Sequence, residues 1–264
     1  MSRDFYIDTD GLNHCSVCKE PVEVLLPENL QISLQMKSHP RQCRCDRERS
    51  EKEARERKER EHIQTVESNT SVCFEEKAMR QWNFANDNGS NPCMNYAKQY
   101  VENWPQMKKD GLGLLLWGGV GSGKSYMAAC IANALLEQEV RVLMTNFATI
   151  INGMFSAADK IDYVNAICGY DLLIIDDLGV ESHSEYRMEG LFNVIDRRVR
   201  SGKPMIITTN LTMKEMDETQ NMDEARIYDR IRAVCQPVAV KGESHRKVNR
   251  AKMMDKFKCV FKSD

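Results

Sequence analysis

The sequence predicts an α/β fold, with a parallel sheet covered by helices on both faces. Two observations favour it. Apolar runs alternate with helical stretches through the second half of the 264-residue chain, and strands that are apolar throughout are typical of parallel sheets buried on both sides. A glycine-rich loop at residues 118–125 lies between one such run and a helical stretch. Strand, loop and helix in this order are the setting in which such loops bind phosphates.

Strands and helices are expected in alternation along the chain. The apolar patterns predict strands at residues 112–117, 140–145, 171–177 and 203–210, and helices at 94–104, 124–136, 147–155, 160–168 and 184–200. Polar residues follow three of these strands. Because ligands bind outside the carboxyl ends of parallel strands, these polar residues are expected to form one site.

Residues 118–125 match the phosphate-loop pattern G-x-x-x-x-G-K-[ST] at every fixed position. The glycines permit positive φ values and close backbone approach, so successive N–H groups can converge on phosphate oxygens. Lys124 is expected at the β- and γ-phosphates of ATP, and Ser125 at a Mg²⁺ ion. A glycine-rich turn that contains Lys-Ser by chance is the alternative, which the flanking strand and helix disfavour. The predicted nucleotide-binding residues here are Gly118, Gly119, Val120, Gly121, Ser122, Gly123, Lys124, Ser125 and Tyr126.

Two acids end the third predicted strand. Asp176 is expected to hold Mg²⁺, mostly through the water shell of the ion. Asp177 is the candidate for orienting or deprotonating the attacking water. Asn210, at the end of the next strand, could bond the γ-phosphate or the same water. A strand-ending turn is the alternative for the two acids, and a turn-starting asparagine is the alternative for Asn210.

Four of the ten cysteines form two close pairs near the start of the chain, Cys15 with Cys18 and Cys43 with Cys45. Two pairs of thiolates from tight turns are what a tetrahedral structural Zn²⁺ site requires. Neighbouring histidines, His14 and His39, could each replace a cysteine. Unconnected reduced cysteines are the alternative, and a disulfide is the least expected state. The other six cysteines are scattered singly, as small buried hydrophobic residues usually are.

Residues 46–61 are almost entirely charged, with acids and bases in balance. Acid-first pairs four residues apart favour a helix; they are Glu48/Lys52, Glu51/Arg55, Glu53/Arg57 and Glu56/Arg60. A solvated helical spacer explains the segment better than an arm that binds nucleic acid, because the charge is balanced. The predicted organisation is a zinc module at 1–45, a charged helical linker at 46–64 and an ATP-binding domain at 65–264.

Composition limits the class of protein. The formal net charge is −2, so any contact with nucleic acid must come from a local patch. Residues 241–262 carry the one local basic excess and could contact single-stranded DNA, although a solvated basic helix explains them equally well. No apolar run approaches the roughly 18 residues that span a bilayer, and the first residues do not resemble a signal peptide. A cytoplasmic protein without a membrane partner is expected.

Residues 117–210 resemble an AAA+ ATPase. Four stretches are similar to the DnaC/DnaI-type helicase loaders of bacteria and phages: 173–179, the 185–200 helix, 202–204 with 208–212, and 226–231. In that group an amino-terminal metal-binding domain engages the helicase, and the cysteine cluster is similar to it. The resemblance implies an ATP-dependent loader that places a replicative helicase hexamer on single-stranded DNA. ATP binding and hydrolysis would switch assembly and release.

Three arginines receive roles from this resemblance alone. Arg230 matches the arginine finger that reaches the ATP of a neighbouring subunit, with Arg226 as the second choice, and this implies a homo-oligomer when ATP is bound. Arg246 matches the sensor-2 arginine, which contacts nucleotide within its own subunit.

Asp177 stands where many AAA+ proteins have glutamate, which argues for slow hydrolysis. An IstB-type transposition ATPase and a nucleotide-switched adaptor without significant turnover are the alternative functions.

Overall fold

The structure is a computed structural model, and it describes residues 4–87, 89, 91–179, 185–242 and 253. Arg246 and most of the basic segment 241–262 therefore lie outside the described residues. The chain divides into two compact units, Met1–Gln64 and Thr65–Asp264. No helix in the described part of the chain is both long and apolar enough to cross a bilayer.

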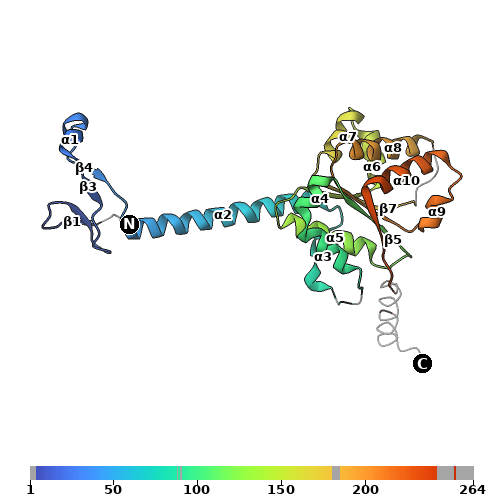
Figure 1. Ribbon diagram of the computed structural model, residues 1–264, viewed down its shortest axis with the longest axis horizontal. Coiled ribbons are helices and arrows are strands. Elements are labelled where there is room, and N and C mark those ends of the chain that lie inside the picture. Colours follow the sequence, from blue (N-terminus) through green and yellow to red (C-terminus); the bar gives the residue numbers. More distant parts are fainter. Residues whose placement is uncertain (1–3, 88, 90, 180–184, 243–252, 254–264) are drawn as a thin grey trace, which may run out of the picture. The chain divides into compact units, whose positions relative to one another are not determined.

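The first unit contains two small hairpins and a short helix, followed by the first part of a long helix (Figure 1). Strand β1 (Phe5–Ile7) pairs antiparallel with β2 (Asn13–Cys15), and β3 (Glu23–Leu25) pairs with β4 (Ser38–Pro40) around helix α1 (Glu28–Leu34). Most of its large apolar side chains are exposed, and its buried side chains include Cys15, Cys43 and His14. A core this small needs another source of stability.

Helix α2 (Arg44–Cys73) contains the whole predicted charged segment and continues beyond it. Its ion pairs differ from the expected ones. The pairs at i, i+4 within 4.0 Å place the base first: Arg44–Glu48, Lys52–Glu56 and Arg57–Glu61. All of these side chains are well exposed, so each pair contributes little to stability.

The second unit is built on a five-stranded parallel sheet with the order β6-β7-β8-β5-β9. Its strands are β5 (Gly113–Trp117), β6 (Val142–Asn146), β7 (Leu172–Leu178), β8 (Met205–Thr209) and β9 (Cys235–Ala239). The first four confirm the predicted strands. Strand β9 was not predicted, because Gln236 and Pro237 interrupt its apolar pattern; proline is tolerated on an edge strand such as this one.

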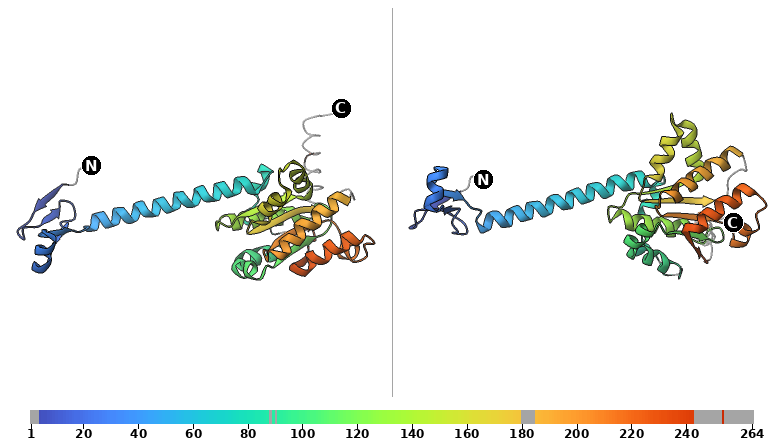
Figure 2. Two further views of the ribbon diagram at one scale, coloured as in Figure 1. Left: turned by 90° about the horizontal axis from the view of Figure 1, so that it is seen from above. Right: turned by 45° about the horizontal axis from the view of Figure 1, so that its top comes forward.

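Helices cover both faces of this sheet, as predicted (Figure 1). In β5, Leu114 and Leu116 enter one core and Leu115 enters the other. The first core is closed by α3 (Met94–Glu102), α4 (Trp104–Asp110) and α5 (Lys124–Leu136). The second is closed by α6 (Phe147–Ser156), α7 (Lys160–Cys168), α8 (Glu185–Arg200) and α10 (Met222–Val234), with the short α9 (Met213–Asp217) beside α10. Helices α8 and α10 lie side by side (Figure 2).

One departure from the predicted helices has a local cause. The predicted helix 94–104 is α3, which ends before Asn103, and a second helix that was not predicted, α4, begins at Trp104 with Pro105 in its first turn. Short 3-10 turns, Lys77–Gln81 and Phe84–Asn86, precede α3.

One charged side chain is fully buried in the second unit. Arg198 of α8 has no exposed surface, and its guanidinium donates to four carbonyl oxygens near the start of β7 and β8. These oxygens belong to Cys168, Tyr170, Asp171 and Pro204. Burial lowers the pKa of Arg198 to about 10, so the side chain remains charged at neutral pH. Arg198 therefore links α8 to the end of the sheet opposite the phosphate loop.

Candidate functional site

The phosphate loop joins the end of β5 to the start of α5, as the sequence predicts. Gly118 has a φ of 151°, and a Cβ atom there would stand 2.4 Å from the carbonyl oxygen of Val240. Gly123 has a φ of 99° and is the N-cap of α5. Side chains at these two positions would strain the backbone or collide with it, so the glycines are required by the path of the loop.

The start of α5 is suited to an anion. Among the described residues, the N-cap Gly123 gives the N-terminus of α5 no side-chain cap, and the N–H groups at such a helix start can bind an anion. Ser122 is buried, and within the described part of the chain its hydroxyl has no hydrogen-bond partner. An unsatisfied buried hydroxyl beside uncapped N–H groups fits a loop that closes around phosphate oxygens.

A series of hydrogen bonds links the ends of three neighbouring strands. The Lys124 ammonium donates to the carbonyl oxygens of Gly118 and Gly119, each at 2.9 Å, and to Asn210 Oδ1 at 2.8 Å. Asn210 Nδ2 in turn donates to Asp177 Oδ1 at 2.8 Å. Residues that follow β5, end β7 and follow β8 are thereby brought together, although the sequence separates Lys124 from Asn210 by 86 positions.

Asp176 and Asp177 lie at the carboxyl end of β7, in an irregular stretch of the strand. Asp176 Oδ1 accepts a hydrogen bond of 2.6 Å from the Thr208 hydroxyl. Asp177 has a φ of 61°, a left-handed conformation that is uncommon for residues other than glycine. Ser125, the predicted second magnesium ligand, is the second residue of α5. A hydroxyl and a carboxylate at one edge of the sheet are the oxygen ligands that Mg²⁺ accepts.

The remaining residues of the predicted nucleotide site differ in exposure. Val120 is 65% exposed at the tip of the loop. The hydroxyl of Tyr126 donates to the carbonyl oxygen of Asn83 at 3.0 Å, and its ring packs against Trp82 with 5.7 Å between centroids. Burial raises the pKa of Tyr126 to about 12. Tyr126 therefore ties the segment before α3 to the phosphate-loop helix.

In the first unit, the four paired cysteines converge. The sulfur atoms of Cys15, Cys18, Cys43 and Cys45 all lie within 4.8 Å of one another. Tetrahedral Zn²⁺ with bonds of about 2.3 Å places its sulfur ligands about 3.8 Å apart, so this cluster is compatible with zinc. His14 is not part of it, because its ring nitrogens bond to the Lys19 carbonyl oxygen and Asp10 Oδ2.

The two candidate finger arginines lie one turn apart on α10. The guanidinium carbons of Arg226 and Arg230 stand 4.5 Å and 4.6 Å from the ring centroid of Phe192 on α8. Arg230 Nε also donates to Asp196 Oδ1 at 2.7 Å, and Arg200 bonds the other oxygen of Asp196 at 2.8 Å. The hydrogen bond from Arg230 is the main cause that lowers the pKa of Asp196. Arg230 therefore pairs with a residue of α8 that lies 34 positions away in the sequence, and the residues beside Arg230 in the sequence do not predict this contact.

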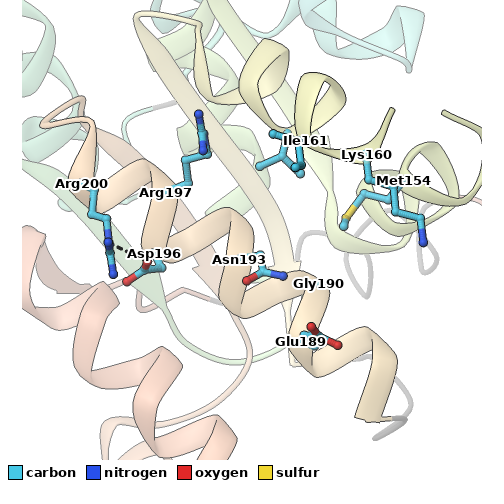
Figure 3. A pocket seen from close by; sticks show the side chains of 10 residues that line it. Met154, Lys160, Ile161, Glu189, Gly190, Asn193, Asp196, Arg197 and Arg200 are labelled. Atoms are coloured by element: carbon cyan, nitrogen blue, oxygen red, sulfur yellow. Dashed lines mark ion pairs between the residues drawn. The ribbon is translucent and has the colours of Figure 1, made fainter. Parts of the chain in front are cut away.

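A cavity of about 470 Å³ opens between α6, α7 and α8 (Figure 3). It is lined by bases such as Lys160 and Arg197 and by acids such as Glu189 and Asp196, so it favours neither charge. None of its lining residues belongs to the phosphate loop. The nucleotide site predicted from the sequence and this cavity are separate features.

Known proteins are similar to part of this chain. The replicative helicase loader DnaC of Escherichia coli (strain K12) is 33% identical over 151 residues, which are 54% of this chain and 58% of DnaC. The replicative helicase loader DnaI of Bacillus subtilis (strain 168) is 28% identical over 149 residues, 52% of this chain and 48% of DnaI. The chain thus spans about half the length of these relatives.

The fold is shared with a solved structure of DnaI. That structure aligns with a TM-score of 0.56 at 23% identity, covering 67% of this chain and 98% of the DnaI chain. A family model described as IstB-like ATP binding protein matches residues 49–253, which include the phosphate loop, both acids, Asn210 and Arg230. The chain belongs to the family of IstB-like ATP-binding proteins.

Proposed function

We propose that this chain is an ATP-dependent loader that places a replicative DNA helicase on single-stranded DNA when replication begins. The similarity to proteins named replicative helicase loaders supports this function. The observation in the site that supports its dependence on ATP is the hydrogen-bonded series Lys124–Asn210–Asp177. It joins the residue that would bind phosphate to the residue that would orient water, so nucleotide binding would alter both.

ATP would take over the hydrogen bonds of Lys124. The Lys124 ammonium donates to two loop carbonyl oxygens and to Asn210. Phosphate oxygens are stronger acceptors than these neutral oxygens. The N–H groups of residues 118–126 would hold the β- and γ-phosphates. When Lys124 turns to the phosphates, Asn210 is released to bond the γ-phosphate or the water that attacks it.

Hydrolysis would be carried out by the acids at the end of β7. Mg²⁺, when bound, would neutralise charge on the β- and γ-phosphates. Ser125 and Asp176 would hold that ion, and Asp177 would orient or deprotonate the attacking water. Aspartate is shorter than glutamate and reaches less far, so we infer slow turnover.

Assembly would complete the site. Arg230, or Arg226 as second choice, would contact the ATP of a neighbouring copy of the chain, and Arg246 would contact the ATP of its own copy. An arginine supplied by another chain couples hydrolysis to assembly. The homo-oligomer would bind single-stranded DNA, to which the basic segment 241–262 could contribute.

The zinc module would hold the helicase. Residues 1–45 lie outside the part matched by the family, and a separate small module suits a separate partner. Zn²⁺ on the four cysteines would fix the shape of this module.

Gel filtration with the replicative helicase encoded by the same genome tests the proposal. The unmodified chain is expected to co-elute with the helicase in ATP, and Cys43→Ser is expected to lose this while still binding ATP. Absence of co-elution under every nucleotide condition would overturn the loader function. Co-elution instead with a transposase encoded by a neighbouring gene would favour the transposition ATPase. Equal, background rates of hydrolysis by the unmodified chain and Lys124→Ala would favour the adaptor.

A further inference from the structure

The two acids occupy a bulge between β7 and β8. The strands pair at Ile175 with Ile207 and next at Leu178 with Thr209. Two residues on β7, Asp176 and Asp177, therefore stand opposite a single residue on β8, Thr208 (these three positions follow from the register). Bulges of this kind occur next to active sites, where they redirect side chains and remove a backbone group from the ladder.

The Thr208 hydroxyl occupies the gap that the bulge creates. It accepts the backbone N–H of Asp177 at 2.8 Å and donates to Asp176 Oδ1 at 2.6 Å. Thr208 is 1% exposed, so water does not compete readily for either bond. A hydroxyl has one donor and two acceptor positions, so this one group can bond the side chain of Asp176 and the backbone of Asp177 at the same time.

We infer that Thr208 is a positioning residue that sets both acids for Mg²⁺ and ATP, an inference that rests on the proposed ATPase function. Among the described residues, Thr208 is the sole hydrogen-bond donor to the Asp176 carboxylate. Its bond to Oδ1 restricts the rotation of that carboxylate. Its second bond holds Asp177 in the left-handed conformation from which its carboxylate reaches Asn210.

Substitution of the hydroxyl separates this role from packing. Thr208→Val keeps the shape and removes both bonds, while Thr208→Ser keeps the hydroxyl and removes one methyl group. Residues that orient a metal ligand typically change metal affinity by about 10–100-fold when they are replaced. Nucleotide contacts to the loop and Lys124 do not involve Thr208, so binding without the metal should persist.

The experiment is a MgCl₂ titration of the binding of a fluorescent ATP analogue to the full chain, starting in EDTA. In EDTA, Thr208→Val should bind the analogue within about twofold of the unmodified chain. The MgCl₂ concentration for half-maximal enhancement should rise at least about tenfold. Thr208→Ser should restore the unmodified value to within about threefold. If Thr208→Val does not fold, Thr208→Ala carries the same expectation with no added bulk.

Thr209→Val is the matched control. Thr209 is also fully buried, and its hydroxyl donates to the Leu178 carbonyl oxygen at 2.7 Å and accepts the Leu211 N–H at 3.1 Å. It bonds neither acid, so its magnesium dependence should match that of the unmodified chain. An unchanged MgCl₂ midpoint in Thr208→Val, or an equal shift in Thr209→Val, would overturn the inference about Thr208 but not the proposed function. Failure of the unmodified chain to bind the analogue would instead overturn the proposed function on which it rests.

Discussion

Asn210 links the phosphate loop to the acids at the end of β7 in the proposed nucleotide site. Its amide oxygen accepts from Lys124 and its amide nitrogen donates to Asp177. An aspartate could accept from Lys124 but could not donate to Asp177, and an alanine could do neither. The amide is therefore suited to hold a cation and an anion at the same time.

Replacement of Asn210 should separate ATP binding from hydrolysis. We expect Asn210→Ala to bind ATP within a few-fold of the unmodified chain, because the loop and Lys124 remain, and to lower kcat about 100-fold. Lys124→Ala should instead weaken binding itself. Steady-state hydrolysis and equilibrium binding of ATP measure the two effects. Equal losses of binding and kcat in Asn210→Ala would contradict this division of roles.

Arg198 is expected to stabilise the second unit through its contacts with backbone carbonyl oxygens. Its replacement by methionine leaves four carbonyl oxygens near the start of β7 and β8 without their donor. We expect Arg198→Met to lower the free energy of unfolding by about 3 kcal/mol. Arg197→Met, at the exposed adjacent position, should change it by less than about 0.5 kcal/mol.

Tryptophan fluorescence in urea measures this change, because all three tryptophans, Trp82, Trp104 and Trp117, lie in the second unit. Equal unfolding midpoints for the two variants would show that the carbonyl contacts of Arg198 contribute nothing to stability.

Among the elements, the hairpins and short helix of the first unit are expected to depend on the four cysteines for their folding. Two short hairpins and a seven-residue helix bury few apolar side chains, so metal binding and folding should be coupled. We expect one Zn²⁺ per chain, and chelation should abolish amide protection in residues 4–42. The urea midpoint by tryptophan fluorescence should not move. Cys43→Ser should behave like chelation, while Cys93→Ser, a cysteine of the second unit, should retain the metal.

Elements with simple apolar patterns were predictable from the sequence, and those shaped by tertiary context were not. Strands β5 to β8 and the phosphate loop follow from local residues. The edge strand β9 did not, because Pro237 obscures it, and the two-helix form of 94–110 depends on one proline. Within the site, Lys124, Asp176 and Asp177 were predicted from motifs. The positioning contacts of Thr208 and Asp196 were not, because a bulge and the packing of α8 on α10 create them.

At the scale of the whole molecule, assembly should supply the missing part of the active site. Phe192 and Asp196 hold the arginine pair of α10 in place before any partner arrives. A positioned guanidinium loses less conformational entropy when it contacts phosphate. The rate of hydrolysis per chain should therefore rise with protein concentration. Arg230→Ala should lower kcat by at least about 1,000-fold without weakening ATP binding.

Mixing two inactive variants tests whether the arginine acts between copies. Lys124→Ala retains Arg230 but cannot hold ATP, and Arg230→Ala retains the ATP site. With random assembly of an equal mixture, about one quarter of the interfaces pair an intact ATP site with an intact Arg230, so about one quarter of the unmodified rate should return. Arg232→Ala is the control, because Arg232 pairs with Asp217 and should leave the rate unchanged. If the mixture stays inactive while Arg226→Ala complements Lys124→Ala, the finger is Arg226. If neither mixture recovers, neither Arg226 nor Arg230 acts across the interface.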